Sequence, residues 1–380
     1  MQIYYIRSIK KQCRGDYVNI LEVNKFFPPH IGGIETIIAQ RAYYLSKFPD
    51  TKIKVLVCQE QGAGKTEILR GIEIIRCGSI GTYFSCPVSF SFFWKFRELS
   101  EWADVIEFHT PFPPGDLACL LSGCRCRVVI SWHSDIIRQK KLLFFYQPVL
   151  RAFLKRADCI ITATQGHIDG SAFLPEFREK CKIIPYPAEK QKHQHFTPIL
   201  TKKLYQQGRI KLLFVGRLVY YKGVEILLKA FRQVKHCELF LCGTGVLEPD
   251  LRKKAAGMPV HFLGNLSHEN LQSAFADCDI FILPSVENAE AFGIVQMEAM
   301  AYGKPVINTD LPTGVPYVSI DHETGLTVPP KDVKALAEAI TILASSPELR
   351  KQYGENGKLR IEKYYNCERI MKQIYEILKG

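Results

Sequence analysis

The sequence predicts an α/β protein with two domains, each built on a parallel sheet with helices on both faces. Three observations lead to this fold class. The chain has 380 residues, which is more than one ordinary hydrophobic core accommodates. Its composition, 47% hydrophobic and 23% charged, is typical of a folded globular protein. Short β-branched runs alternate with helical stretches along the whole chain, which is the pattern of βαβ units.

The expected strands form two series. The first comprises Val18–Val23, Ile53–Cys58, Val105–Phe108, Val128–Trp132 and Ile160–Ala163. The second comprises Ile210–Gly216, Glu238–Cys242, Val260–Leu263, Ile280–Leu283 and Pro305–Asn308. Residues 185–208 lie between them, are polar and lack periodicity, so we interpret them as the linker.

These series give an expected division of the chain. A first Rossmann-like domain covers residues 1–190, with residues 1–16 as a loose extension. A second covers residues 191–360, and an amphipathic helix over residues 361–380 returns to the first domain. Because ligands of parallel sheets bind at the carboxyl ends of the strands, two such domains facing each other would form a deep cleft.

Composition also restricts the class of protein. No apolar run approaches the roughly 18–20 residues that span a bilayer. The basic amino-terminal segment has no apolar core followed by a cleavage site, so a secretion signal is not expected. The 13 cysteines are scattered, and the closest pair, Cys124 and Cys126, has C-x-C spacing. No metal quartet emerges, and we expect reduced thiols in a cytosolic enzyme.

The formal net charge of +12 is concentrated in the first half of the chain. Residues 125–156 form a long basic and aromatic stretch in which Asp135 is the only acidic residue. Its cations are Arg125, Arg127, Arg138, Lys140, Lys141, Arg151, Lys155 and Arg156, interleaved with Leu142, Leu143, Phe144, Phe145 and Tyr146. Such a face can rest on an anionic membrane surface. An ordinary helix that packs its aromatic residues inward has the same pattern.

The most informative stretch runs from Glu290 to Glu298, two carboxylates around a glycine turn. It follows the apolar run 280–283 and leads into a helical segment that Gly303-Lys304-Pro305 ends. A helix starting near Phe292 would direct unpaired backbone N–H groups and a positive dipole end at an anion such as a diphosphate. The two carboxylates could then accept hydrogen bonds from hydroxyls on either side of that anion. The alternative is a capping glutamate followed by a solvated one.

The ends of other expected strands carry residues that could bind the same kind of ligand, a diphosphate linked to a sugar. Gly216-Arg217 ends the first strand of the second domain and Lys222-Gly223 follows, so two cations can hold a diphosphate there. Gly32-Gly33 opens an expected helix over residues 36–45, where a backbone without side chains can approach a phosphate. His133 follows a strand of the first domain and is a candidate contact to a reacting sugar. Solvated basic loops and a structural histidine are the alternatives.

Two motifs point elsewhere. Gly64-Lys65-Thr66 resembles the end of a P-loop, but Gln59 stands where that motif needs glycine, and residues 67–74 read as a strand or hairpin. Asp277-Cys278-Asp279 has the D-x-D spacing of metal-dependent sugar transferases but precedes a strand instead of following one. We therefore expect no metal site and no cofactor.

Together these residues resemble a family-4, GT-B-fold retaining glycosyltransferase, from about residue 17 onward. The resemblance rests on Glu290-Ala291-Phe292-Gly293 through Met297-Glu298, on Gly216-Arg217 with Lys222-Gly223, on Gly243-Thr244-Gly245, and on Asn24, Pro28-Pro29 and Gly32-Gly33-Ile34-Glu35. One departure is Pro185-Tyr186-Pro187, where many relatives have glycine at the third position.

The resemblance implies the roles of the site residues. Arg217 and Lys222 would hold the diphosphate, Glu298 the ribose hydroxyls, and Glu290 the hydroxyls of the donor sugar. The amides of Phe292, Gly293 and Ile294 would assist at the phosphate, with Gly32, Gly33, Gly216 and Gly243 close to the donor. His133 would contact the sugar from the opposite domain. No protein nucleophile is required, because in a front-face mechanism the departing phosphate oxygen takes the proton of the acceptor.

Residues 132–140 and 313–318 are similar to bacterial mannosyl- and rhamnosyltransferases of O-antigen synthesis. This similarity implies GDP-mannose or a similar GDP-sugar as donor, with a UDP-hexose as the alternative. It implies a lipid-linked saccharide as acceptor and a peripheral position at the cytoplasmic face of the inner membrane, with no nucleic acid as partner. A GT-B epimerase or phosphorylase, and a nucleotide-binding protein using Gly64-Lys65-Thr66, are the alternatives of a different class.

Overall fold

A computed structural model describes residues 17–30, 32–136, 140–188, 196–203 and 205–380. The chain forms two compact units. The first comprises Met1–Trp132, Lys141–Ile161 and Gln373–Gly380, and the second His133–Lys140 and Thr162–Lys372. The extension expected over residues 1–16 and the part of the expected linker over residues 189–195 lie outside the described residues. The division at residues 190 and 360 stays a prediction.

An eight-stranded sheet has the order β10-β9-β8-β7-β1-β2-β4-β3. Its strands are β1 Val18–Val23, β2 Thr51–Cys58, β3 Lys65–Leu69, β4 Ile72–Cys77, β7 Val105–Thr110, β8 Arg127–Trp132, β9 Cys159–Thr162 and β10 Cys181–Ile183. β1 pairs in parallel with both β2 and β7. Among the strand pairs of this sheet whose register is described, only β3 and β4 are antiparallel. A separate hairpin joins β5 Thr82–Tyr83 to β6 Cys86–Pro87.

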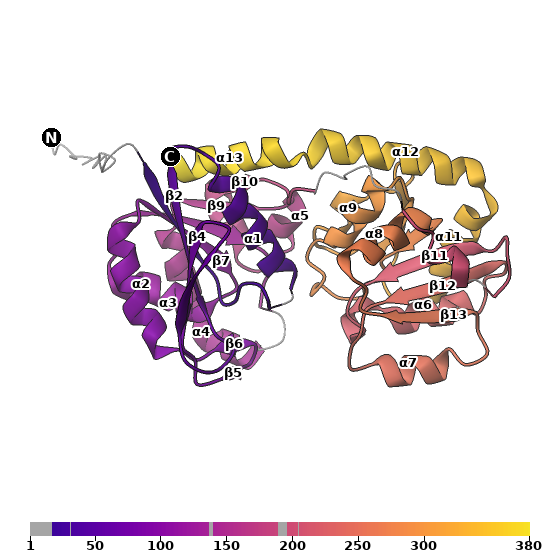
Figure 1. Cartoon of the computed structure of the whole chain (residues 1–380), viewed down its shortest axis with the longest axis horizontal. Helices are drawn as coiled ribbons and strands as arrows, with labels where there is room; N and C mark the ends of the chain where they lie inside the picture. Colours follow the sequence, from indigo (N-terminus) through magenta and orange to yellow (C-terminus); the bar gives the residue numbers. More distant parts are fainter. Residues whose placement is uncertain (1–16, 31, 137–139, 189–195, 204) are drawn as a thin grey trace. The chain divides into compact units, whose positions relative to one another are not determined.

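Helices cover this sheet because βαβ crossovers carry the chain from one parallel strand to the next. In Figure 1, α2 and α3 lie on one side of the strands and α1 on the other. The helices are α1 Gly33–Leu45, α2 Phe90–Trp102, α3 Pro113–Ser122 and α4 Lys140–Arg156; α5 Gln165–Asp169 and the 3-10 helix η1 Leu174–Lys180 follow in the chain and belong to the second unit. Phe96 of α2 packs on Phe92 of the same helix and on Phe108 of β7, and all three side chains are fully buried.

A six-stranded parallel sheet in the second unit has the order β13-β12-β11-β14-β15-β16. Its strands are β11 Ile210–Val215, β12 Cys237–Cys242, β13 Val260–Gly264, β14 Ile280–Ile282, β15 Val306–Thr309 and β16 Gly325–Val328. Each strand expected from the sequence, in both series, is present with bounds within two residues. Strand order in this sheet reverses between β11 and β14, which is where ligands of doubly wound sheets bind.

The helices of this unit connect its strands in the same way. They are η2 Thr201–Lys203, η3 Tyr220–Lys222, α6 Val224–Phe231, α7 Glu248–Lys254, α8 His268–Asp277, α9 Ile294–Ala301, α10 Val315–Val318 and α11 Val333–Ser345, and the chain ends with α12 Pro347–Tyr364 and α13 Cys367–Lys379. The helix expected over residues 361–380 begins later, at Cys367, because α12 ends at Tyr364; the residues of α13 from Gln373 onward belong to the first unit. Asn366 Oδ1 accepts a hydrogen bond from the amide of Arg369, 3.0 Å away, and so caps α13.

Candidate active site

Lys222 and Glu290, predicted from separate parts of the sequence, are in contact. Lys222 Nζ lies 2.5 Å from Glu290 Oε2, and both side chains are largely buried. The hydroxyl of Ser285, at the end of β14, donates to the same carboxylate oxygen over 3.0 Å. A buried carboxylate needs such compensation, since desolvation disfavours its charge. The structure therefore brings the expected diphosphate cation and the expected sugar-binding carboxylate to one place.

The loop that carries Lys222 is held against the end of β14 by its backbone. Gly223 adopts φ +68°, and a Cβ built there would lie 1.9 Å from the carbonyl oxygen of Pro284. The same two segments are joined by a backbone hydrogen bond, in which the amide of Val286 donates to the carbonyl of Tyr221 over 2.8 Å. Only glycine combines this left-handed conformation with so close an approach. Lys222 is thus fixed beside the Glu290 loop by main-chain packing.

The helix behind Glu290 begins at a glycine in the left-handed conformation. Gly293, with φ +73°, precedes α9, and in the described structure no side chain caps this helix end. The fully buried Gln296 holds the loop from below: its Nε2 donates to the carbonyl oxygens of Phe292 and Val315, at 3.2 and 3.3 Å. Asn308, on β15, donates to Gln296 Oε1 over 2.9 Å. The start of α9 and the loop before it are therefore held in place by Gln296 and Asn308, and anion binding by the first-turn amides stays a prediction.

The other residues that the sequence predicts for the donor site lie in or just after neighbouring elements of the second unit. Gly243 follows β12, and a Cβ there would lie 2.1 Å from the carbonyl oxygen of Gly216, so the two chain segments touch. Arg217 is exposed, and its Nη2 donates to the hydroxyl of Tyr221 over 2.9 Å. Glu298 lies one turn inside α9, half-buried, and its charge adds to burial in raising the pKa of Tyr302 to about 12.

His133 belongs to the same compact unit as the Glu290 loop. It is 3% exposed, and its Nδ1 lies 2.6 Å from the hydroxyl of Tyr186. The ring of Tyr186 in turn meets the ring of Phe292 edge to face, with centroids 4.7 Å apart. From the sequence, Tyr186 was noted only as part of the departure at Pro185-Tyr186-Pro187. The contact joins His133 to the Glu290 loop through two aromatic rings.

Gly32 and Gly33 lie in the first unit, where Gly32 precedes α1 and Gly33 begins it. A Cβ on Gly32 would lie 2.1 Å from Glu35 Oε2, because the buried Glu35 side chain folds back over this turn. His30 Nδ1 lies 3.5 Å from the same carboxylate. The glycine turn is therefore packed against an acidic side chain, and a role of Gly32 and Gly33 at the donor stays a prediction.

Comparison with known proteins decides the family. The family profile described as "Glycosyltransferase Family 4" matches residues 31–185, and that described as "Glycosyl transferases group 1" matches residues 197–360. The D-rhamnosyltransferase WbpZ of Pseudomonas aeruginosa is 34% identical over 294 residues, 74% of this chain and 75% of that protein. This chain is a family-4 glycosyltransferase. The O-antigen chain mannosyltransferase C of Escherichia coli is also similar to it, with 29% identity over 93% of this chain and 96% of that protein.

Solved structures agree on the fold of the glycosyltransferase. A sucrose-phosphate synthase of Thermosynechococcus elongatus superposes with a TM-score of 0.75 at 21% identity, covering 95% of this chain and 98% of that one. Anabaena HepE in complex with UDP gives 0.74 at 19% identity, over 95% and 100% of the two chains. The lipopolysaccharide glycosyltransferase WaaG gives 0.70 at 17%, over 96% and 100%. The expected GT-B fold is thereby confirmed.

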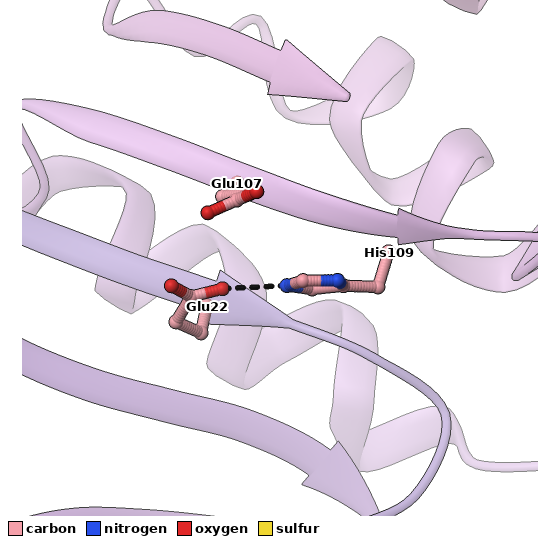
Figure 2. Close-up of side chains that lie close together, drawn as sticks. All are labelled: Glu22, Glu107 and His109. Atoms are coloured by element: carbon pink, nitrogen blue, oxygen red, sulfur yellow. Dashed lines mark hydrogen bonds and ion pairs between the residues drawn. The ribbon is translucent and has the colours of Figure 1, made fainter. Parts of the chain in front are cut away.

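A buried polar cluster lies inside the first unit of the glycosyltransferase. Glu22 on β1 and Glu107 on β7 are direct register partners, and His109 Nε2 lies 2.7 Å from Glu22 Oε2 (Figure 2). Arg41, on α1, donates to Glu107 and, over 2.7 Å, to the hydroxyl of Ser131. Burial, partly offset by the charge of Arg41, raises the pKa of Glu22 to about 7; burial also raises that of Glu107 and lowers that of His109 to about 3.

This cluster has the donor types of a metal site, with ligand atoms of Glu22, Glu107 and His109 within 4.8 Å of one another. Arg41 already supplies a positive charge to Glu107, and a second cation beside it would be repelled. One proton on the two carboxyl groups, together with Arg41, leaves the cluster neutral. Among the described residues, Glu22 Oε1 and Glu107 Oε2 have no hydrogen-bond partner, which fits a proton shared between them. We interpret the cluster as a brace between α1 and the strands.

The two misleading motifs have structural roles in the glycosyltransferase. Lys65 and Thr66 lie in strand β3, where a P-loop would begin a helix, and Lys65 Nζ pairs with Glu67 over 2.8 Å. Asp277 accepts hydrogen bonds from the amides of Leu200 and Thr201, at 2.7 and 2.8 Å. Asp279 accepts one from the amide of Lys211. The P-loop alternative is therefore wrong, and both aspartates anchor the chain that enters β11.

Proposed function

We propose that this glycosyltransferase moves a mannosyl or similar hexosyl residue from a GDP-sugar to a lipid-linked saccharide in the synthesis of O-antigen or a related surface polysaccharide. The contact between Lys222 and Glu290 beside the start of α9 carries the proposal, because it joins a cation, a carboxylate and free helix amides. The similarity to an O-antigen chain mannosyltransferase and to a D-rhamnosyltransferase supports the donor class. A GDP-mannose-dependent mannosyltransferase of Corynebacterium glutamicum, 33% identical over 43% of this chain, supports it too.

The chemistry assigned to the site follows from these groups. Lys222 and Arg217 neutralise the diphosphate, whose negative charge grows as the bond to the sugar breaks. The amides of Phe292, Gly293 and Ile294 donate to phosphate oxygens, with no metal ion required. When the diphosphate takes Lys222, Glu290 is released to accept hydrogen bonds from sugar hydroxyls, while Glu298 accepts from the ribose and His133 contacts the sugar. The acceptor hydroxyl attacks the anomeric carbon from the face that the phosphate leaves, and the configuration is retained.

The test uses the purified chain with a lipid-diphosphate oligosaccharide and a donor set of GDP-mannose, UDP-glucose, UDP-galactose and dTDP-rhamnose. Released nucleotide gives the rate, and NMR of the product gives the anomeric configuration. We expect turnover with GDP-mannose and an α-linked product. Preference for a UDP-hexose would replace the donor assignment by its alternative. An inverted product would refute retention, and donor epimerisation or phosphorolysis without acceptor would refute the transferase assignment for this site.

Lys222→Met supplies the matched test of the site. We expect turnover to fall by about 100-fold or more, because one preorganised charge at a departing oxygen is lost. Lys229→Met is the control, since Lys229 is exposed on α6 and pairs with Glu225 over 3.1 Å. Thermal unfolding of both variants checks the fold. Equal turnover of Lys222→Met and the control would contradict the diphosphate role.

The proposed acceptor implies work at the cytoplasmic face of the inner membrane, where α4 would rest on the lipid surface. Phe144 and Phe145 are 71% and 80% exposed, so the reading in which all aromatic residues of this segment pack inward is wrong. Arg156 is not available to a membrane, because it donates to the carbonyls of Cys124 and Cys126, at 3.1 and 2.7 Å. Arg138 and the side chains of Lys140 and Lys141 lie outside the described residues. Within the described part of the chain, no helix has both the length and the apolar composition to cross a bilayer.

A further inference from the structure

Tyr186 occupies a confined position next to His133. Its side chain is buried, its hydroxyl lies 2.6 Å from His133 Nδ1, and the two rings are stacked with an interplanar angle of 25°. Pro185 and Pro187 flank it, and each fixes its own φ near −65°. The segment that carries Tyr186 therefore has little conformational freedom, and the hydroxyl is held at the imidazole.

The Tyr186 ring also meets the Glu290 loop. Phe292, two residues after Glu290, packs edge to face on Tyr186. The loop is held a second time by the amide of Gly314, which donates to the carbonyl of Ala291 over 2.7 Å. A displacement of the Tyr186 ring would therefore be resisted on both sides, by His133 and by Phe292.

The hydrogen bond has a consequence for the protonation of His133. A neutral imidazole carries one hydrogen, and the partner of one ring nitrogen decides which nitrogen holds it. An imidazole nitrogen without a hydrogen can only accept, and a phenol carries an O–H that can donate. If its O–H donates to Nδ1, the imidazole hydrogen must lie on Nε2. Nε2–H can then donate to a hydroxyl or a developing negative charge on a ligand.

We propose that Tyr186 is a positioning residue for the transfer reaction: it holds His133 as the Nε2–H tautomer and fixes its ring relative to the Glu290 loop through Phe292. The inference rests on the proposed role of His133 at the donor sugar. Tyr186 itself touches no substrate in this account. It acts through the orientation and the donor pattern of the histidine.

The first experiment measures the tautomer without any glycosyl transfer. Nitrogen NMR of the full chain with labelled histidine distinguishes a ring nitrogen that carries hydrogen from one that accepts a hydrogen bond, and His133→Gln assigns the signals. We expect Nε2 of His133 to carry the hydrogen in the unmodified protein. In Tyr186→Phe, which keeps the ring and its packing, we expect the tautomers to mix. A hydrogen on Nδ1 in the unmodified protein, or an unchanged spectrum in Tyr186→Phe, would overturn the proposal.

The second experiment measures rates. Tyr186→Phe should lower kcat about tenfold, the effect of one lost hydrogen bond on a barrier, with little change in the KM of the donor. In a His133→Ala background the same substitution should have no further effect. Tyr353→Phe, which removes another buried tyrosine hydroxyl on α12, is the control.

The outcomes distinguish the proposed role of His133 from that of Tyr186. If His133→Ala leaves turnover unchanged, the proposed role of His133 fails, while the NMR result still decides whether Tyr186 sets its tautomer. If His133→Ala lowers turnover and Tyr186→Phe does not, the role of Tyr186 is refuted and that of His133 stands. Losses that add in the double variant would show that Tyr186 acts elsewhere.

Discussion

Glu22 and Glu107 place two carboxyl groups side by side in the interior of a parallel sheet. In the sequence they interrupt apolar strands, within Leu21-Glu22-Val23 and Ile106-Glu107-Phe108. Like charges in this position repel each other unless a cation or a proton compensates them. Arg41 reaches Glu107 from α1, and the raised pKa of Glu22 places a proton on the pair up to about neutral pH.

This proton gives a pH dependence of stability. In the unfolded chain Glu22 has the ordinary pKa of 4.5, and burial in the folded protein raises its pKa to about 7. Between these values the folded state binds more protons, so the free energy of unfolding falls as pH rises from about 4.5 to about 7 and then levels. Glu22→Gln mimics the protonated form. We expect it to match the unmodified protein at pH 5 and to be more stable at pH 8, by up to about 3 kcal/mol.

Urea unfolding at pH 5, 6, 7 and 8 measures the effect. Glu73→Gln, on β4, is the control, because Glu73 is half-exposed and pairs with Lys54 over 2.9 Å. A Glu22→Gln variant that is destabilised equally at every pH would show that the carboxylate itself is needed, and would contradict the shared proton.

At the scale of elements, the turn between β11 and α6 depends on one glycine. Gly223 has a left-handed backbone and its Cα lies against the carbonyl of Pro284. Gly257 has a similar φ of +75° but open space around it. The two positions separate the cost of the backbone conformation from the cost of the contact.

We expect Gly257→Ala to lower the free energy of unfolding by about 1 kcal/mol, the cost of the left-handed region for a residue with a side chain. Gly223→Ala should cost about 3 kcal/mol or more, because its methyl group meets a backbone carbonyl that cannot move aside. Chemical denaturation measures both. Since Lys222 is displaced with the turn, turnover of Gly223→Ala should also fall. Equal stability losses at the two positions would refute the steric argument.

The elements differ in how far their sequences define them. β1 and β12 were predicted within a residue, because short, mostly apolar runs of this length form buried strands even where a polar residue interrupts them. The break between α12 and α13 was missed. Tyr365 and Asn366 are weak breakers, and the break coincides with a tertiary hydrogen bond from the amide of Ala188 to the carbonyl of Tyr365. The capping Asn366, followed by Glu368, was the local signal that could have located it.

At the scale of the whole molecule, the positive net charge and the exposed aromatic residues of α4 lead to a test of membrane binding. Arg151 and Lys155 are exposed on α4. Arg151→Gln with Lys155→Gln should weaken binding to vesicles that contain phosphatidylglycerol, by about 1 kcal/mol for each charge. Phe144→Ser with Phe145→Ser should weaken it further and less salt-dependently, since the lost contribution is apolar.

Sedimentation with vesicles at low and high salt measures both variants, and nucleotide binding should be unaffected in each. Lys334→Gln with Lys351→Gln removes the same charge from α11 and α12, where both lysines are exposed. If vesicle binding falls as much in this control as in the Arg151→Gln and Lys155→Gln variant, the net charge of the protein and not the position of these residues on α4 would explain the loss. Undiminished binding of both α4 variants would refute the membrane role of α4.

The sequence by itself determined the fold class, the strands and the family, because apolar periodicity and glycine positions are local properties of the chain. It also named Lys222, Glu290 and Glu298 as candidates, since each follows or continues an element whose end it could locate. Only the tertiary structure decided that Lys222 pairs with Glu290, that Tyr186 holds His133, and that Gln296 and Asn308 support the loop. Most of these contacts join residues that are more than ten positions apart in the chain, and their partners are selected by packing, which no local pattern encodes.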